Sequence, residues 1–384
     1  MIPYSTQSID EKDILSVIKA LKSDRLTQGK INLNFEKKIA KFTNSKYCLT
    51  TNSASSGLLL ACKALDLKKN DIAWTVPNTY AATANAILHA GLKVDFVDID
   101  LKTYNISIEK LEIKLKSAKK KNKLPKLLIP VHFGGLPCNM KKIGFLSKKY
   151  NFKIIEDASH ALGSKFFKNT IGDCKYSDLC VFSFHPVKII TTGEGGAVTT
   201  NDRKYYNKIN ALRSGGIFRE KKFLNKKNMP GWYYEQHLLG YNFRLNELQA
   251  ALGNSQLTKI KVLNQKRKKI VNRYYNNLKN LPIELPLVEK FYESANHLFV
   301  IRIKFSTKIN RDIVYNKLLD NGIESNVHYI PVFHHPYFEK FNFNKMNFKN
   351  SETYIKEALS LPIYPKMSFK DQSKVINTLK KIFQ

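Results

Sequence analysis

Short apolar runs alternate with helical repeats along most of the chain. Runs rich in Val, Ile, Leu, Phe and Cys predict buried strands at residues 47–51, 72–76, 94–98, 127–133, 152–157, 180–184 and 197–200. Apolar residues that recur every three to four positions predict helices at residues 58–65, 108–121, 204–213 and 248–257. Strands and helices that alternate at this spacing imply an α/β fold, a large domain with a mostly parallel central sheet flanked by helices.

The two ends of the chain differ from this pattern. Ser8 and Glu11 have the spacing of a capping box, and the apolar residues after them predict an amphipathic helix that the turn at residues 27–29 ends. After a long basic helix at 258–279 and a proline-punctuated link at 281–286, we expect strands at 297–305 and 325–329 and helices at 312–321, 351–359 and 368–383. We therefore predict a large domain at 1–257 and a smaller C-terminal α+β domain at 258–384, which the long helix enters.

The composition is that of an ordinary globular protein, with 384 residues of which 43% are hydrophobic and 25% charged. No apolar run has the length of a membrane span, and the amino terminus lacks the pattern of a signal peptide. We therefore expect a cytoplasmic protein with no membrane partner. The five cysteines show no Cys-x-x-Cys spacing, so we expect free thiols and no metal site.

The formal net charge of +33 raises the question of nucleic-acid binding. The basic residues are mostly lysines dispersed along the whole chain, densest at 117–126 and 258–269, and a compositional bias explains such dispersal equally well. We therefore expect no nucleic-acid partner. The positive field would still attract a substrate that carries a diphosphate.

A lysine lies in a glycine-rich loop between two predicted strands. The strand at 180–184 stops at His185 and Pro186, Lys188 follows in a polar turn, and three glycines come at 193–196 before the next strand. A lysine at such a place can be partly desolvated, as a Schiff-base lysine must be. A single lysine in a lysine-rich chain is more often a solvated surface charge.

Two carboxylates, Glu156 and Asp157, end the strand at 152–157, some thirty residues before this lysine. In open α/β sheets ligands bind at the carboxyl ends of the strands. An acid there fits a carboxylate held against a pyridinium nitrogen while the lysine holds the aldehyde of pyridoxal phosphate. Taken alone, Asp157 would fit a helix N-cap equally well.

A turn of small residues at 52–57 precedes the predicted helix at 58–65. Small side chains let the amide groups at a helix start approach a phosphate, which the helix dipole favours. A serine-rich N-cap without a ligand would have the same sequence.

These motifs carry a family resemblance. The segments Glu156-Asp157-Ala158-Ser159-His160-Ala161-Leu162-Gly163, Ser183-Phe184-His185-Pro186-Val187-Lys188 and Gly193-Glu194-Gly195-Gly196 resemble the DegT/DnrJ/StrS nucleotide-sugar aminotransferases, which are fold-type I pyridoxal phosphate enzymes. Further stretches at 26–29, 74–80, 130–135, 232–236 and 326–332 are similar to the pseudaminic acid branch of that family. The resemblance extends from Ile2 to Pro362.

The resemblance implies roles for particular residues. Lys188 would bond to pyridoxal phosphate and Asp157 would hold its pyridine nitrogen. His160 would pack near the ring or its hydroxyl, or behind a residue that does. The other implied cofactor contacts are Tyr80 on the ring, Ala54, Ser55 and Ser183 at the phosphate, and Asn242 and Arg244 at the phosphate of the neighbouring subunit. Thr27, His328 and Tyr329 would face the sugar-nucleotide, although Thr27 also reads as a plain helix terminator.

The implied activity is a transamination in an obligate homodimer with shared active sites. Glutamate would give its amino group to C4 of a UDP-linked 4-keto sugar, the 6-deoxy-N-acetylhexosamine UDP-2-acetamido-2,6-dideoxy-β-L-arabino-hexos-4-ulose. The irregular, aromatic-rich stretch at 217–236 is expected to be a mobile loop over the site.

Other readings remain open at this point. The same chemistry could serve a keto sugar of the bacillosamine, perosamine or aminoarabinose type. The related sugar dehydratases carry histidine where Lys188 stands, which argues against them. A non-enzymatic regulator of this fold, or a nucleic-acid binder, would make the pairing of Asp157 with Lys188 accidental.

Overall fold

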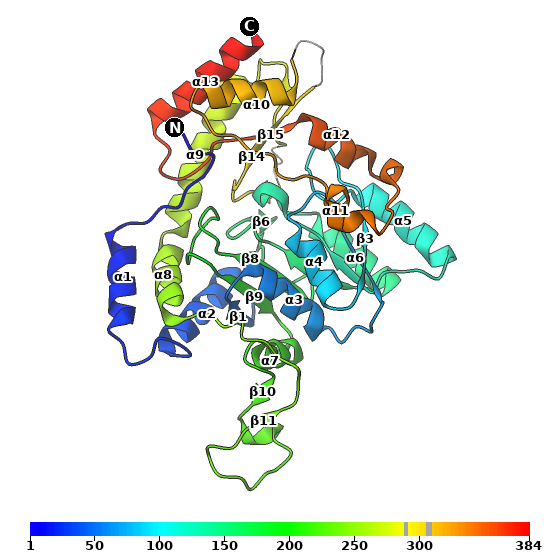
Figure 1. The fold of residues 1–384 in the computed structure, drawn as a ribbon, viewed down its shortest axis with the longest axis vertical. Helices are drawn as coiled ribbons and strands as arrows, with labels where there is room; N and C mark the ends of the chain where they lie inside the picture. The colour runs from blue at the N-terminus through cyan, green and yellow to red at the C-terminus, as the bar shows by residue number, and fades with distance from the viewer. Residues whose placement is uncertain (288–290, 305–308) are drawn as a thin grey trace.

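The computed structural model describes residues 1–287, 291–304 and 309–384, and a seven-stranded sheet forms its centre (Figure 1). The strand order is β1-β9-β8-β5-β4-β2-β3, with bounds β1 (Tyr47–Thr51), β2 (Ile72–Thr75), β3 (Lys93–Phe96), β4 (Leu127–Ile129), β5 (Lys153–Asp157), β8 (Leu179–Ser183) and β9 (Gly196–Thr200). Strand β9 is antiparallel to both neighbours, β1 and β8, and the other strands of the sheet run parallel to one another. The predicted mostly parallel sheet is confirmed.

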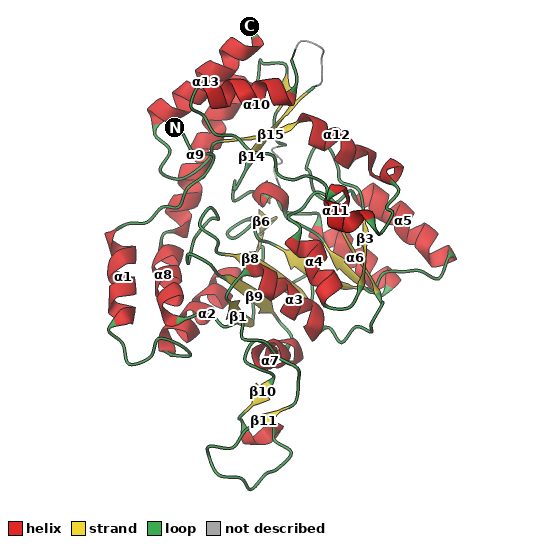
Figure 2. Cartoon of the chain, viewed as in Figure 1, coloured by secondary structure: helices red, strands yellow, loops and turns green. Residues whose placement is uncertain are grey.

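Helices cover both faces of this sheet (Figure 2). Side chains alternate along each strand, so Ile154 and Cys180 face one layer of helices while Ile155 and Val181 face the other. The first layer consists of α2 (Lys30–Thr43), α5 (Ile108–Lys120) and α6 (Met140–Tyr150). The second consists of α3 (Ala54–Ala64), α4 (Ala82–His89) and α7 (Arg203–Leu212). Because both faces are buried, the strands are continuous apolar runs, which is why they could be found in the sequence.

A third apolar cluster lies in the C-terminal part of the chain. It joins α9 (Ile260–Leu278), α10 (Arg311–Asp320) and α13 (Phe369–Phe383) to an antiparallel sheet of β12 (Ile283–Glu284), β14 (Phe299–Ile303) and β15 (Ala358–Leu361). This is the expected α+β arrangement. The division at 257/258 stays a prediction, and Ile2 at the amino terminus packs in the same cluster.

Shorter elements complete the chain. They are α11 (Pro336–Glu339), α12 (Lys349–Glu357), β6 (Lys165–Phe166), β7 (Asn169–Thr170), β13 (Tyr292–Glu293), η1 (Phe133–Gly135), η3 (Val332–His334) and η4 (Lys345–Phe348). Among the described residues, no helix has both the length and the apolar character needed to cross a bilayer.

The amino-terminal helix α1 (Glu11–Leu21) begins differently from the prediction. Its capping box is formed by Asp10 and Asp13 and not by Ser8 and Glu11. Asp13 is fully buried, and Gln256 and Lys259 donate hydrogen bonds to its carboxylate. The helix therefore turns its acidic residue inward and leaves apolar residues such as Leu15 and Leu21 more than half exposed.

Several predicted boundaries were wrong for local reasons. The strand expected at 127–133 ends at Ile129, because Pro130 has no N–H for the ladder. Helix α3 begins at Ala54 instead of residue 58, since Ser53 caps it. The strand expected at 325–329 is reduced to one bridge, Asn326 with Ser360. The basic helix expected at 258–279 separates at Lys259 into the end of α8 (Glu247–Thr258) and α9. Phe305, at the end of another expected strand, lies outside the described residues.

The stretch at 217–236 forms an arm that projects from the body of the molecule below α7 (Figure 1). Strands β10 (Ile217–Phe218) and β11 (Glu235–Gln236) pair at its base, and η2 (Lys221–Phe223) follows β10. The Glu235 carboxylate accepts hydrogen bonds from the N–H groups of Asn225 and Lys226 and so ties the arm together. In this chain the arm points away from the central sheet (Figure 1), and the expected mobile loop over the active site stays a prediction.

Candidate active site

Lys188 lies in the loop that joins β8 to β9. The loop is fixed at its base, where the Phe184 N–H donates to the Gly195 carbonyl (2.9 Å), and the Lys188 N–H closes a turn onto the His185 carbonyl (2.9 Å). Burial lowers the pKa of the Lys188 amine from 10.5 to about 8, although the negative charge of Asp157 acts in the opposite direction. An amine with this pKa is partly neutral at physiological pH and can act as a nucleophile or base.

Asp157 ends β5 and is buried, with its carboxylate turned toward α4. Oδ1 accepts hydrogen bonds from the Ser159 N–H (3.1 Å) and the Ser159 hydroxyl (2.6 Å). Oδ2 accepts one from the Thr83 hydroxyl (2.7 Å). Three hydrogen-bond donors therefore hold this carboxylate in its buried position.

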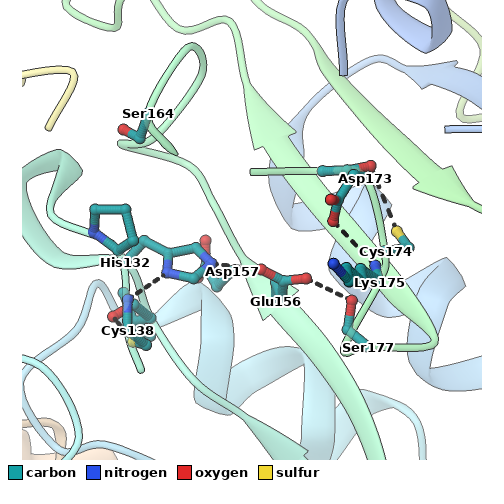
Figure 3. Close-up of polar contacts among 12 residues, drawn as sticks. His132, Cys138, Glu156, Asp157, Ser164, Asp173, Cys174, Lys175 and Ser177 are labelled. Carbon is teal, nitrogen blue, oxygen red and sulfur yellow. Dashed lines mark hydrogen bonds and ion pairs between the residues drawn. The ribbon is translucent and has the colours of Figure 1, made fainter. Parts of the chain in front are cut away.

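The neighbouring acid, Glu156, is used differently. It points to the opposite face of the sheet, where Oε2 lies 2.7 Å from His132 Nε2 and Oε1 accepts the Ser177 hydroxyl (Figure 3). The Cys138 N–H donates to His132 Nδ1, so Nε2 carries the imidazole proton. The two acids that end the strand therefore separate into one on the side of Lys188 and one that ties the end of β5 to the segment after β4 and the segment before β8.

Aromatic and imidazole rings form a wall beside Lys188. The Gly134 N–H donates to His160 Nδ1 (3.2 Å), so Nε2 carries the proton and donates to the Tyr329 hydroxyl (3.1 Å). His297 packs on His160 with ring centroids 4.4 Å apart. Burial, with the positive charge of Lys188 as a further cause, holds the pKa of both imidazoles well below 6.5. Lys188 is therefore the group in this wall region that titrates near neutral pH.

The start of α3 offers two free amide groups. The N–H groups of Ala54 and Ser55 have no hydrogen-bond acceptor among the residues that the structure describes. A Cβ built on Gly196 would lie 2.7 Å from the Ala54 nitrogen, so β9 approaches this helix start as closely as only glycine permits. Ser183, at the end of β8, accepts a long hydrogen bond (3.4 Å) from the His185 N–H through its hydroxyl.

The residues predicted to contact the substrate come from two segments: His328 and Tyr329 from one, and Thr27 from the turn before α2. His328 is buried, and its Nδ1 contacts the Ser360 hydroxyl (2.8 Å); burial and then the charge of Lys188 lower its pKa to about 3. Tyr329 follows it, and the exposed ring of Tyr80 lies 6.1 Å from the Tyr329 ring. Thr27 is exposed, in a turn that the Glu247 carboxylate holds through the Gly29 N–H (2.9 Å).

Asn242 and Arg244 precede α8 and belong less closely to the group of residues around Lys188. Asn242 is exposed and forms a bridge with Ser214, and Arg244 is half-buried. Between them, the Phe243 carbonyl accepts the Asn52 N–H (2.9 Å) just before α3. Among the described residues, neither these two nor Thr27 forms a hydrogen bond with Lys188, Asp157 or His160.

Sequence reasoning missed three residues of this site: Thr83, Ser159 and His297. Ser159 carried a signal, because a serine two residues after an aspartate commonly bonds back to it. His297 fell within a predicted strand and gave no signal of its own. Thr83 is 74 residues from Asp157 in the sequence, so only the tertiary structure brings the two together.

The chain is similar to known proteins over its whole length. The model of the DegT/DnrJ/EryC1/StrS aminotransferase family matches residues 7–380. The chain belongs to this aminotransferase family. The aminotransferase is 38% identical to a UDP-4-amino-4,6-dideoxy-N-acetyl-beta-L-altrosamine transaminase of Campylobacter jejuni over 385 residues, which cover 100% of this chain and 98% of the relative.

Solved structures agree with this assignment. The aminotransferase superposes on Helicobacter pylori PseC, an aminotransferase involved in the biosynthesis of pseudoaminic acid, with a TM-score of 0.90 and 31% identity; the match covers 100% of this chain and 99% of PseC. The putative sugar aminotransferase Spr1654 from Streptococcus pneumoniae, in its PMP form, gives a TM-score of 0.89 at 26% identity, with 100% and 99% covered. The fold-type I architecture is therefore confirmed, and the enzyme depends on pyridoxal phosphate.

The residues of the site fit this cofactor. The two free amide groups at the start of α3 can receive a phosphate, and the helix dipole favours its charge. The glycine at residue 196 leaves them accessible on the side of β9. Lys188, with its lowered pKa, and the buried carboxylate of Asp157 supply the two remaining groups that such a cofactor needs.

Proposed function

We propose that the aminotransferase moves the amino group of glutamate to C4 of UDP-2-acetamido-2,6-dideoxy-β-L-arabino-hexos-4-ulose, a step of pseudaminic acid biosynthesis. The observation that carries this proposal is the end-to-end similarity to transaminases named for the altrosamine product, at 38% identity in Campylobacter jejuni and 32% in Helicobacter pylori. The lowered pKa of Lys188 beside Asp157 supplies the chemistry that the reaction requires.

Pyridoxal phosphate, when bound, supplies an electron sink for the bonds broken at the substrate carbon. Lys188 would hold the cofactor and, once released, move a proton between the α-carbon of the donor and C4′ of the cofactor. Its partly neutral amine makes that transfer possible near neutral pH. Asp157 would keep a proton on the pyridine nitrogen. Ala54, Ser55 and Ser183 would bind the phosphate, and Tyr80 would cover one face of the ring.

The wall of His160, His297 and Tyr329 would exclude water from the other side. Since His160 donates to the Tyr329 oxygen, the Tyr329 hydroxyl keeps its own proton free to donate to a bound ligand. We propose that Tyr329 and the neutral imidazole of His328 contact the sugar, and that Thr27 contacts the sugar-nucleotide from the opposite side.

We propose a homodimer with shared active sites. Exposed aliphatic side chains gather on α1, on the turn after it and on α2, at Ile14, Leu15, Ile18, Leu21, Leu26 and Leu33. A surface of this kind is typical of a protein interface. The projecting arm at 217–236 is then available to the neighbouring subunit. So is the Arg244 guanidinium, which has no ion-pair or hydrogen-bond partner among the residues that the structure describes, and there Arg244 and Asn242 would bind the cofactor phosphate.

A mixed dimer tests this sharing directly. Lys188→Ala and Arg244→Ala are each inactive if the proposal holds. When the two are mixed and allowed to exchange subunits, one site of the mixed dimer has both residues intact only if Arg244 acts on the neighbouring subunit. Recovery of about a quarter of the wild-type activity supports sharing, whereas no recovery would assign Arg244 to its own chain.

We also propose a cytoplasmic location and no nucleic-acid partner. The five cysteines of the chain are all buried and free, which suits a reducing compartment. To identify the substrate, the enzyme would be given glutamate and a panel of UDP-linked 4-keto sugars, and the amino sugar identified by NMR. Preference for a keto sugar of the bacillosamine type would keep the chemistry and overturn the pathway.

A further inference from the structure

The Asp157 carboxylate has only one acceptor position left. Each carboxylate oxygen can accept about two hydrogen bonds. Both positions of Oδ1 are filled by Ser159, through its N–H (3.1 Å) and its hydroxyl (2.6 Å). Within the described part of the chain, Oδ2 accepts a single hydrogen bond, from the Thr83 hydroxyl (2.7 Å). A ligand that donates to Asp157 must therefore bind Oδ2, the oxygen that Thr83 also holds.

The Thr83 hydroxyl is the middle member of a series of hydrogen bonds. Its oxygen lies 2.9 Å from the Thr79 hydroxyl, and both threonines are buried. A carboxylate can only accept, so the Thr83 proton is committed to Asp157 and Thr79 must donate to Thr83. Successive hydrogen bonds of this kind polarise one another. This series of hydrogen bonds runs from the turn that carries Tyr80, through the first turn of α4, to the end of β5.

We propose that Thr83 is a positioning residue for the cofactor, which keeps Asp157 ionised and directs the remaining lone pair of Oδ2 at the pyridine nitrogen. This inference rests on the proposed role of Asp157. A hydrogen bond to the ionised form of an acid stabilises that form. A carboxylate that stays ionised leaves the proton on the ring nitrogen, where the electron sink needs it. Without the Thr83 donor, the same proton would shift toward Oδ2.

A purely structural role for Thr83 predicts something different. The bond between Thr83 and Asp157 also joins α4 to β5, and a structural bond of that kind would affect stability alone. Three substitutions separate the two roles. Thr83→Val keeps the shape and removes the hydroxyl, and Thr83→Ser keeps the hydroxyl. Thr75→Val is the matched control, because it removes another buried threonine hydroxyl, which donates to the Ile129 carbonyl (2.8 Å) away from Asp157.

The experiment measures the visible absorbance of each protein with bound pyridoxal phosphate as a function of pH, and the rate at which glutamate changes that spectrum. A ring nitrogen that loses its proton withdraws fewer electrons from the attached Lys188 nitrogen. The pH midpoint of the absorbance change in Thr83→Val should therefore rise by about one pH unit, and the glutamate rate should fall about tenfold or more. Thr83→Ser should stay within about threefold of the wild type, and Thr75→Val should show the wild-type midpoint.

Two results would overturn the inference: a wild-type midpoint in Thr83→Val, or equal impairment of Thr83→Val and Thr83→Ser. If Thr83→Val does not fold, Thr79→Val replaces it. Its pH midpoint should rise by a smaller amount, and a wild-type midpoint in Thr79→Val would then overturn the inference. A wild-type protein that develops no absorbance band with pyridoxal phosphate would instead refute the proposed function itself.

Discussion

The lowered pKa of Lys188 sets the pH dependence of cofactor capture. Only a neutral amine attacks the aldehyde of pyridoxal phosphate. With a pKa of about 8, about 9% of the Lys188 amine is neutral at pH 7, compared with roughly 0.03% for a lysine of pKa 10.5. Burial therefore makes the neutral fraction of this lysine about 300 times larger than that of a solvated one.

The sign of the effect follows from the cause. Burial penalises the ammonium form, so the neutral form is favoured and the pKa falls. The rate of capture by the cofactor-free protein should rise about tenfold between pH 7 and 9 and then level off, because the amine is almost fully neutral above its pKa. A solvated lysine would continue to gain about tenfold per pH unit up to pH 10.

The assay follows the absorbance of the cofactor-free protein after rapid mixing with pyridoxal phosphate across this pH range. Nα-acetyl-lysine in the same buffers serves as the reference. Its rate divided by its own neutral-amine fraction gives the effect of the cofactor's ionisations, and the rate of the protein is corrected for that effect. Lys188→Met, which has no amine, should develop no band. If the wild-type rate still climbs tenfold per unit above pH 9, the burial argument for Lys188 is refuted.

Three other substitutions, one of them with a matched control, test the electron sink, the phosphate site and a buried ion pair. Asp157→Asn should lower the glutamate half-reaction rate by about 100-fold or more, as the loss of a buried charged partner implies. The pH at which Lys188 captures the cofactor at half its maximal rate should also fall below 8, and a rise in that pH would contradict this. Gly196→Ala places a Cβ 2.7 Å from backbone at the start of α3, so titration with pyridoxal phosphate should show at least about tenfold weaker binding. Gly231→Ala, whose Cβ meets nothing within 4 Å, should bind it as the wild type does. Glu36→Gln removes the charge that faces the buried Arg213 guanidinium at 2.6 Å. The free energy of unfolding, measured in urea, should fall by about 3 kcal/mol. An unchanged urea midpoint would contradict this.

The central sheet could be predicted because its strands are buried on both faces. The prediction at 47–51 matched β1, and Lys188 and Asp157 could be found since each follows an apolar run that ends in an unusual turn. Helix α2 was not predicted, because its apolar positions are interrupted by buried polar residues such as Asn32 and Glu36, which bond to Thr50. The buried face of α2 mixes these polar residues with Phe35 and Ile39, and such a mixture weakens the apolar periodicity.

Contacts between distant segments explain the remaining errors. Strand β15 was taken as the end of a helix, and its pairing with β14 is set more than fifty residues away. Leu15 and Leu21 of α1 are exposed although the pattern is amphipathic. The proposed dimer would cover them, and a sequence pattern does not distinguish a face that packs within the chain from one that packs on a partner. The carboxylate of Asp157 was predicted, but its partner Thr83 was not, because no local rule joins residues 74 positions apart.

One spectroscopic cycle tests both the cofactor chemistry of Lys188 and the proposed sugar substrate. The purified protein with pyridoxal phosphate should show a visible absorbance band that glutamate converts to the pyridoxamine form. Addition of UDP-2-acetamido-2,6-dideoxy-β-L-arabino-hexos-4-ulose should then restore the original band, because the amino group leaves on the sugar. A band that glutamate converts but this keto sugar does not restore would contradict the proposed substrate, and the absence of any band would contradict the assignment of Lys188.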